Sequence, residues 1–145
     1  ERALVRFADP QDVVQMATFG STKIASEFVH IRIGGDLALL KGMMKVIFER
    51  EARGEKIIDH DFIREHTVGL DAIRAEVVAQ TWTDIAAASG LEEAQIRRCA
   101  EIYIRSRATM ICYGMGLTQH QEGSRLLQQV VNAGALPKPS FGRTR

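Results

Sequence analysis

The chain contains 145 residues, of which 46% are hydrophobic and 26% are charged. This composition is typical of a globular protein with a single core, and it excludes a disordered or fibrous chain. With 19 basic and 18 acidic residues the formal net charge is +1, so neither nucleic acid nor a membrane surface is an expected partner.

The N-terminal part is predicted to be an irregular lead-in over residues 1–28. Asp9-Pro10 marks a turn, and the short apolar patch that follows has no sustained periodicity. The chain begins without Met, which we interpret as a sign that it comes from a longer polypeptide. No apolar run approaches the roughly 18 residues of a membrane-spanning helix.

Two apolar runs are predicted to be buried strands. Residues 28–33 (FVHIRI) are rich in β-branched and aromatic side chains and stop at a glycine pair. Residues 109–113 (TMICY) show no polar alternation, as expected of a strand that is covered on both faces. The fold class expected is α/β, a helix-rich three-layer segment with a small parallel sheet and Rossmann-like strand–loop–helix units over residues 29–136. A flexible tail is expected over residues 137–145.

Helical periodicity accounts for most of the remaining sequence. The predicted helices span residues 36–50, 59–66, 70–79, 83–89, 92–106 and 120–135. The first should be mostly buried, with Lys41, Lys45 and Glu49 forming a narrow polar stripe. Asp36 stands where an N-cap belongs, and Gly90 suits the position after a helix C-terminus.

The same local pattern occurs twice in the sequence: an apolar run is followed by a glycine loop with a polar residue, and then by the start of a helix. In open α/β sheets ligands collect at such loops, because glycine lets the backbone approach and the helix N-terminus offers unpaired amides. The carboxylate of Asp36 can accept the N–H groups of guanine, whereas the second loop offers donors for phosphate or pterin oxygens. The candidate ligand-binding residues are Gly34, Gly35, Asp36, Gly114, Met115, Gly116, Thr118, Gln119 and His120.

Ordinary structural roles explain these features as well. The complete GxGxxG fingerprint is absent, so spacing alone favours loop and cap roles over nucleotide binding. His120 has no nucleophile motif around it, and no catalytic residue is predicted. Cys99 and Cys112 lack zinc-site spacing and are expected to be buried thiols in a reducing compartment, so no metal ligand is predicted either.

Three ordered blocks resemble molybdopterin oxidoreductases of the formate dehydrogenase-like type, in particular the cytoplasmic alpha-subunit-like group. The resemblance covers most of the chain, from about Phe7 to Asn132. The blocks are residues 30–47 (HIRIGGDLALLKGMMKVI), 57–73 (IIDHDFIREHTVGLDAI) and 114–132 (GMGLTQHQEGSRLLQQVVN).

The resemblance implies an internal segment of a larger cytoplasmic, multidomain enzyme. Members hold molybdenum or tungsten between two molybdopterin guanine dinucleotides, often with an iron–sulfur cluster nearby. By position, Gly34, Gly35 and Asp36 would approach one dinucleotide, with Asp36 accepting from guanine, and residues 114–120 would line the cofactor and the approach to the metal. The implied partners are the remaining domains of the polypeptide, a small substrate such as formate and an electron-transfer subunit.

Some family features do not match this chain. The family's Cys or selenocysteine metal ligand and its cluster cysteines lie upstream of the matching region, so the isolated segment should hold no metal and be inactive. After Asn132 the sequence AGALPKPSFGRTR departs from the family, and no role carries over to Arg143. The competing interpretation is a stand-alone α/β module that binds a simple nucleotide or another protein without catalysis.

Overall fold

The structure is a computed structural model that describes residues 5–106, 108–119 and 121–137. The chain divides into two compact units, residues 1–30 and residues 31–145. None of the helices in the described ranges is long and apolar enough to cross a membrane.

The first unit is small and mostly exposed. It contains strand β1 (Arg6–Phe7), helix α2 (Val13–Thr18) and strand β2 (Thr22–Lys23), and the two strands pair antiparallel. Asp12 caps α2 by accepting hydrogen bonds from the backbone N–H groups of Val14 and Gln15, at 2.9 and 3.1 Å. The helix ends at Phe19, whose backbone is left-handed (φ 53°) and whose side chain is 96% exposed.

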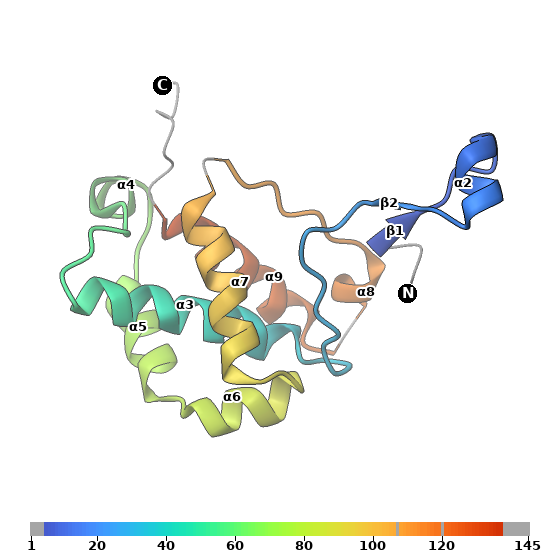
Figure 1. The fold of residues 1–145 in the computed structure, drawn as a ribbon. Coiled ribbons are helices and arrows are strands. Elements are labelled where there is room, and N and C mark those ends of the chain that lie inside the picture. Colours follow the sequence, from blue (N-terminus) through green and yellow to red (C-terminus); the bar gives the residue numbers. More distant parts are fainter. Residues whose placement is uncertain (1–4, 107, 120, 138–145) are drawn as a thin grey trace. The chain divides into compact units, whose positions relative to one another are not determined.

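The second unit is a helical assembly built around one central helix. Helix α3 contacts α5, α6, α7 and α9, which lie around it in Figure 1. The helices of this unit are α3 (Asp36–Ala52), α4 (His60–His66), α5 (Leu70–Ala79), α6 (Trp82–Ser89), α7 (Glu93–Arg105), α8 (Met115–Thr118) and α9 (Gly123–Ala135).

The core of this unit lies along α3. Its main cluster comprises Met44, Ile47, Phe48, Ile58, Ile63, Val77, Ala133 and Leu136. Helix α3 also packs against α6 and α7. At this contact a Cβ added to Gly42 of α3 would lie only 2.7 Å from Cγ2 of Ile96 of α7. The small residue therefore allows α7 to approach the central helix closely.

The predicted parallel sheet is wrong. Residues 28–33 and 109–113 have no regular secondary structure, and within the described ranges the strands are the antiparallel pair β1 and β2. Ile33 is 93% exposed and Met110 is 88% exposed, so these apolar runs are not covered as expected. A strand needs a hydrogen-bonded neighbour, and the described residues supply none to either run. The Rossmann-like three-layer arrangement is therefore also wrong, whereas the helix-rich character is confirmed.

The predicted helices are confirmed, with differences at their ends. The last helix begins at Gly123 rather than near residue 120, and the short helix α8 precedes it. Asp36 is not the N-cap of α3; Gly35 holds that position. Gly90 does end α6 in a left-handed conformation, with φ 74°.

Two expectations about burial are also wrong. Lys41 and Lys45 were expected on a polar stripe but are buried, because their amino groups find partners on α5 and just beyond it. Cys99 is half-buried and Cys112 is exposed, so Cys112 is not the buried thiol expected from its apolar neighbours.

Candidate functional site

The first glycine loop forms a tight turn before α3. The N–H of Gly35 donates to the carbonyl of Arg32 at 2.8 Å, and Gly34 has a φ of 78°, which strains any residue with a side chain. The turn therefore needs glycine at position 34 for conformational reasons.

Gly35 packs closely against the C-terminal end of α6. A Cβ at this position would lie 2.9 Å from both the Cα and the carbonyl oxygen of Ser89. The N–H of Arg32 donates to that same carbonyl at 2.8 Å, and its guanidinium donates to the carbonyl of Ala87 at 3.0 Å. The close approach that Gly35 permits is thus to the protein itself.

Asp36 is the first residue of α3 and is half-buried. Its carboxylate makes no hydrogen bond or ion pair with any residue in the described ranges. The carboxylate oxygens are therefore available to a donor from a ligand, beside the amides of the first helical turn.

The second glycine loop is exposed. Gly114 precedes α8, and a Cβ added at Gly114 or at Gly116 would meet no atom within 4 Å. Met115 is 72% exposed, and Thr118 and Gln119 are exposed as well. His120 lies outside the described residues. Unlike Gly35, the glycines of this loop leave open space that a ligand can approach.

The first loop precedes α3 and the second precedes α8, and both of these helices pack on α9 (Figure 1). The exposed amides of the second loop suit phosphate oxygens, and the unpaired carboxylate of Asp36 suits the N–H groups of guanine. The two loops thus offer both acceptor and donor groups. No group of three or more His, Cys, Asp or Glu side chains within the described ranges is placed to hold a metal ion.

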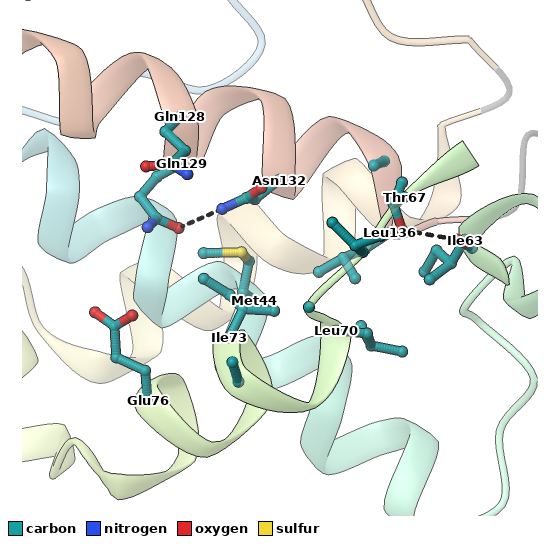
Figure 2. Close-up of a pocket in the computed structure, with 14 residues that line it drawn as sticks. Met44, Ile63, Thr67, Leu70, Ile73, Glu76, Gln128, Gln129, Asn132 and Leu136 are labelled. Atoms are coloured by element: carbon teal, nitrogen blue, oxygen red, sulfur yellow. Dashed lines mark hydrogen bonds between the residues drawn. The ribbon is translucent and has the colours of Figure 1, made fainter. Parts of the chain in front are cut away.

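A separate cavity lies between α3, α5 and α9. Its volume is about 320 Å³. Figure 2 shows Gln128, Gln129 and Asn132 on the α9 side and Ile73 and Glu76 on the α5 side, with Met44 of α3 between them. None of these residues belongs to either glycine loop.

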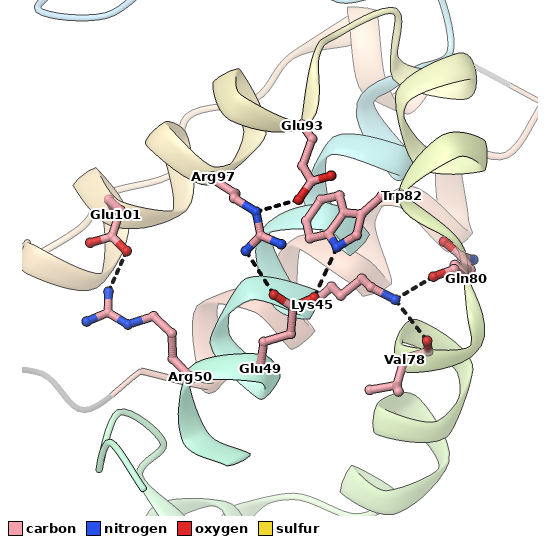
Figure 3. Close-up of polar contacts among 9 residues, drawn as sticks. All are labelled: Lys45, Glu49, Arg50, Val78, Gln80, Trp82, Glu93, Arg97 and Glu101. Carbon is pink, nitrogen blue, oxygen red and sulfur yellow. Dashed lines mark hydrogen bonds and ion pairs between the residues drawn. The ribbon is translucent and has the colours of Figure 1, made fainter. Parts of the chain in front are cut away.

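A polar network joins α3 to α6 and α7. The carboxylate of Glu49 accepts from the guanidinium of Arg97 at 2.8 Å and from the indole N–H of Trp82 at 3.0 Å (Figure 3). The guanidinium also lies 4.4 Å from the centre of the Trp82 ring and donates to Glu93. Burial opposes ionisation of Glu49, but these hydrogen bonds outweigh it and lower its pKa. The network is internally paired, which favours a structural role.

Lys45 attaches the end of α5 to the central helix. Its amino group donates to the carbonyls of Val78 and Gln80 (Figure 3). The sequence pattern indicated neither the burial of Lys41 and Lys45 nor the cavity. One signal for their burial was present in the sequence: the two lysines stand four residues apart within an apolar stretch of the helix. Lysines on a buried face need partners for their charges, so this spacing predicts paired amino groups.

Comparisons with known proteins relate the chain to oxidoreductases. No family model matches it. The chain is 44% identical over 151 residues to Protein YdeP of Escherichia coli (98% of this chain, 20% of YdeP), and 37% identical over 147 residues to an uncharacterized oxidoreductase of Mycobacterium tuberculosis (98% and 19%).

A more distant relative is formate dehydrogenase H of Escherichia coli. The identity is 28% over 126 residues, which cover 84% of this chain and 17% of the relative. The chain thus spans about a fifth of the length of the relatives it matches. These similarities establish a relationship to oxidoreductases over most of the chain.

Proposed function

We propose that this chain is a cofactor-binding segment of a larger molybdopterin-dependent oxidoreductase that resembles formate dehydrogenase. The observation that carries the proposal is the extent of the similarity to formate dehydrogenase H. Because the match covers 84% of a 145-residue chain, a continuous match includes both glycine loops wherever it begins.

In this proposal the two loops hold one pterin guanine dinucleotide. Asp36 accepts the N–H groups of guanine, and Gly34 and Gly35 shape the turn that presents it. The open backbone at Gly114 and Gly116 lets the dinucleotide approach, with Thr118, Gln119 and His120 as donors to its oxygens and Met115 beside it. When bound, the molybdenum or tungsten cofactor supplies the redox chemistry, and this segment supplies binding and orientation.

The reaction of the whole enzyme is part of the same proposal. The resemblance implies the two-electron oxidation of a small substrate such as formate, with electrons leaving through iron–sulfur centres outside this segment to an electron-transfer subunit. The isolated chain should therefore bind guanine nucleotides without turning over substrate.

Titration of the chain with GMP tests the guanine assignment. We expect Asp36→Ala to weaken GMP binding by about 10-fold or more, since a hydrogen bond to a charged group contributes about 1.5–3 kcal/mol. Asp71→Ala is the matched control, because Asp71 is an exposed acid in the first turn of α5. AMP lacks the adjacent N1–H and 2-amino donors of guanine, which a carboxylate can accept together, so it should bind more weakly. Equal binding of GMP and AMP, or GMP binding that is indifferent to Asp36, contradicts the assignment.

Metal analysis of the complete gene product tests the enzyme assignment. Protein made in a host that synthesises the cofactor should contain molybdenum or tungsten, and Gly116→Ala should reduce that content without lowering thermal stability. The open space around Gly116 explains the second expectation, because an added methyl group meets no protein atom. Finding neither metal in the purified protein would exclude this function.

A further inference from the structure

The first unit has no apolar core of its own. None of residues 5–30 is buried, and the buried hydrophobic side chains of the described residues all belong to residues 44–136. Several large apolar side chains of this unit are instead more than half exposed. They are Phe7, Val13, Val14, Met16, Phe19 and Ile24. A cluster of exposed apolar residues of this kind usually marks a contact with another protein surface.

The elements of this unit are too short to be stable by themselves in water. Helix α2 has 6 residues, and β1 and β2 have 2 residues each. Isolated helices shorter than about 12 residues and isolated two-stranded ribbons are marginal in water, because most of their stability comes from packing. The unit therefore needs an apolar surface to pack on, and residues 5–30 do not provide one.

Hydrogen bonds between polar side chains hold α2 against the two strands. The side-chain oxygen of Gln15 accepts from the backbone N–H of Asp9 at 3.1 Å, and its amide nitrogen donates to the hydroxyl of Thr22 at 3.4 Å. The guanidinium of Arg6 donates to the hydroxyl of Ser21 at 2.7 Å. The polar side chains thus fix the orientation of α2, while its apolar side chains stay exposed.

Phe19 occupies a position at the end of α2 that favours glycine. Its backbone is left-handed (φ 53°), a conformation that is strained for a bulky residue, and Gly20 follows it directly. Strained residues cluster at functional sites, where the side chain does something that glycine cannot do. The ring is 96% exposed, so no contact within the described residues explains the strain. An exposed aromatic side chain beside apolar neighbours suits the anchor of a protein–protein contact.

The composition of α2 favours an apolar protein surface as the partner. Val13, Met16 and Ala17 lie on one side of the helix, because residues three and four apart are neighbours there. The helix has no charged side chain, and the carboxylate of Asp12 is used to cap it. Helices that bind membranes or nucleic acid present Lys and Arg, so these partners do not match α2. An amphipathic helix in an apolar groove is a common mode of protein recognition.

The comparison with Protein YdeP indicates where such a groove lies. The match covers 98% of this chain but only 20% of YdeP, so residues that correspond to α2 belong there to a much longer polypeptide. A groove on the same polypeptide meets α2 at a high effective concentration, whereas a second copy must be recruited from solution.

We propose that α2 and Phe19 dock into an apolar groove formed by a part of the same polypeptide outside residues 1–145, which rests on the chain being a segment of a larger enzyme. Phe19 is the anchor, and Val13 and Met16 pack beside it. Docking buries the apolar side chains that the first unit leaves exposed and supplies the stability that its short elements lack.

Photocrosslinking of the complete gene product tests the docking. With p-benzoylphenylalanine in place of Phe19, illumination should join position 19 to a peptide of the same polypeptide outside residues 1–145, identified by mass spectrometry. The same amino acid in place of Gln11 is the control, because Gln11 is exposed and lies before the other end of α2. The control should give much less of this product, and the yield from position 19 should not depend on protein concentration.

Phe19→Gly separates docking from a local structural role. Glycine relieves the backbone strain at this position but removes the anchor. In the complete protein, hydrogen exchange of the α2 amides should become about 10-fold faster or more, as expected for the loss of an interface anchor. In the 145-residue chain the same substitution should not accelerate exchange. Gln11→Gly is the control and should change exchange in neither protein.

Several results would overturn the proposal. They are a crosslink from position 19 to a second copy or to residues 31–145, the absence of any crosslink, and unchanged exchange of Phe19→Gly in the complete protein. Metal analysis distinguishes this failure from that of the cofactor assignment. A complete protein that forms the crosslink but contains neither molybdenum nor tungsten refutes the cofactor assignment alone, whereas a metal-containing protein without the crosslink refutes the docking alone.

Discussion

At the scale of single residues, the glycines of the two loops have different roles. Gly34 is required by a positive φ and Gly35 by contact with Ser89, whereas Gly114 and Gly116 meet nothing in the structure. The first loop thus has a structural explanation that is independent of any ligand. The second loop has none within the described residues, which makes its glycines the better indicators of a binding role.

Substitution of Gly35 should be costly for folding. Gly35→Ala places a methyl group 2.9 Å from backbone atoms of Arg32 and Ser89, which cannot move aside as a flexible side chain does. We expect a loss of about 1–3 kcal/mol in the free energy of unfolding, measured by urea denaturation. Gly114→Ala is the control and should change stability by less than about 0.5 kcal/mol. Equal effects of the two substitutions would show that the turn is not packed as described.

The pH dependence of stability should depend on Glu51. Burial opposes ionisation of its carboxylate, but hydrogen bonds from His60 and from the N–H groups of Ile58 and Ile57 outweigh it and lower its pKa. A lowered pKa in the folded state gives stabilisation that is present above the unfolded pKa of about 4.3 and is lost as pH falls through the folded value.

We therefore expect Glu51→Gln to be less stable than the wild type by about 1–3 kcal/mol at pH 7. The difference should shrink as the pH falls below about 4, because the wild-type carboxyl group then becomes protonated. Urea denaturation at pH 7, 5 and 3 measures it. Glu65→Gln is the control, since the Glu65 side chain is 76% exposed. A difference that stays constant with pH would count against the role of the charged carboxylate.

At the scale of helices, the packing of α7 on α3 depends on a pair of complementary residues. Ile96 is fully buried and Gly42 leaves room for it. Ile96→Ala should lower the free energy of unfolding by about 2–5 kcal/mol because it leaves a cavity.

Adding Gly42→Ala to that variant should restore part of the loss. The new methyl group enters the vacated space, and alanine favours helix over glycine by about 1 kcal/mol. A double-mutant cycle by chemical denaturation measures the coupling. If Gly42→Ala has the same effect with Ile96 present and absent, the two side chains do not share this space.

At the scale of the whole molecule, the buried apolar side chains of the described residues belong to the second unit. A chain that begins at Ile31 should therefore fold by itself, with helical circular dichroism and a single cooperative thermal transition close to that of the full chain. The control is a chain that ends at Arg105, which lacks α9 and with it the core residues Ala133 and Leu136, and which should not fold cooperatively. Loss of cooperativity in the chain from Ile31 would show that the second unit needs the first.

The sequence by itself determined the helices and several of their ends. Amphipathic spacing and helix-end signals such as Asp59 and Gly90 act within a few residues of the chain. They can therefore be recognised without knowledge of the tertiary contacts. The proposed ligand contacts at Asp36 and Gly116 stay predictions, because they depend on a cofactor rather than on the chain.

Only the tertiary structure decided which apolar and charged residues are covered. Residues 28–33 and 109–113 have the composition of buried strands, but a strand exists only where another strand pairs with it, and composition does not encode that partner. Lysine is a residue type that is usually exposed, yet Lys41 is buried because α5 brings Glu76 to its amino group. The cavity beside this ion pair also arises from three helices distant in sequence, so only their packing creates it.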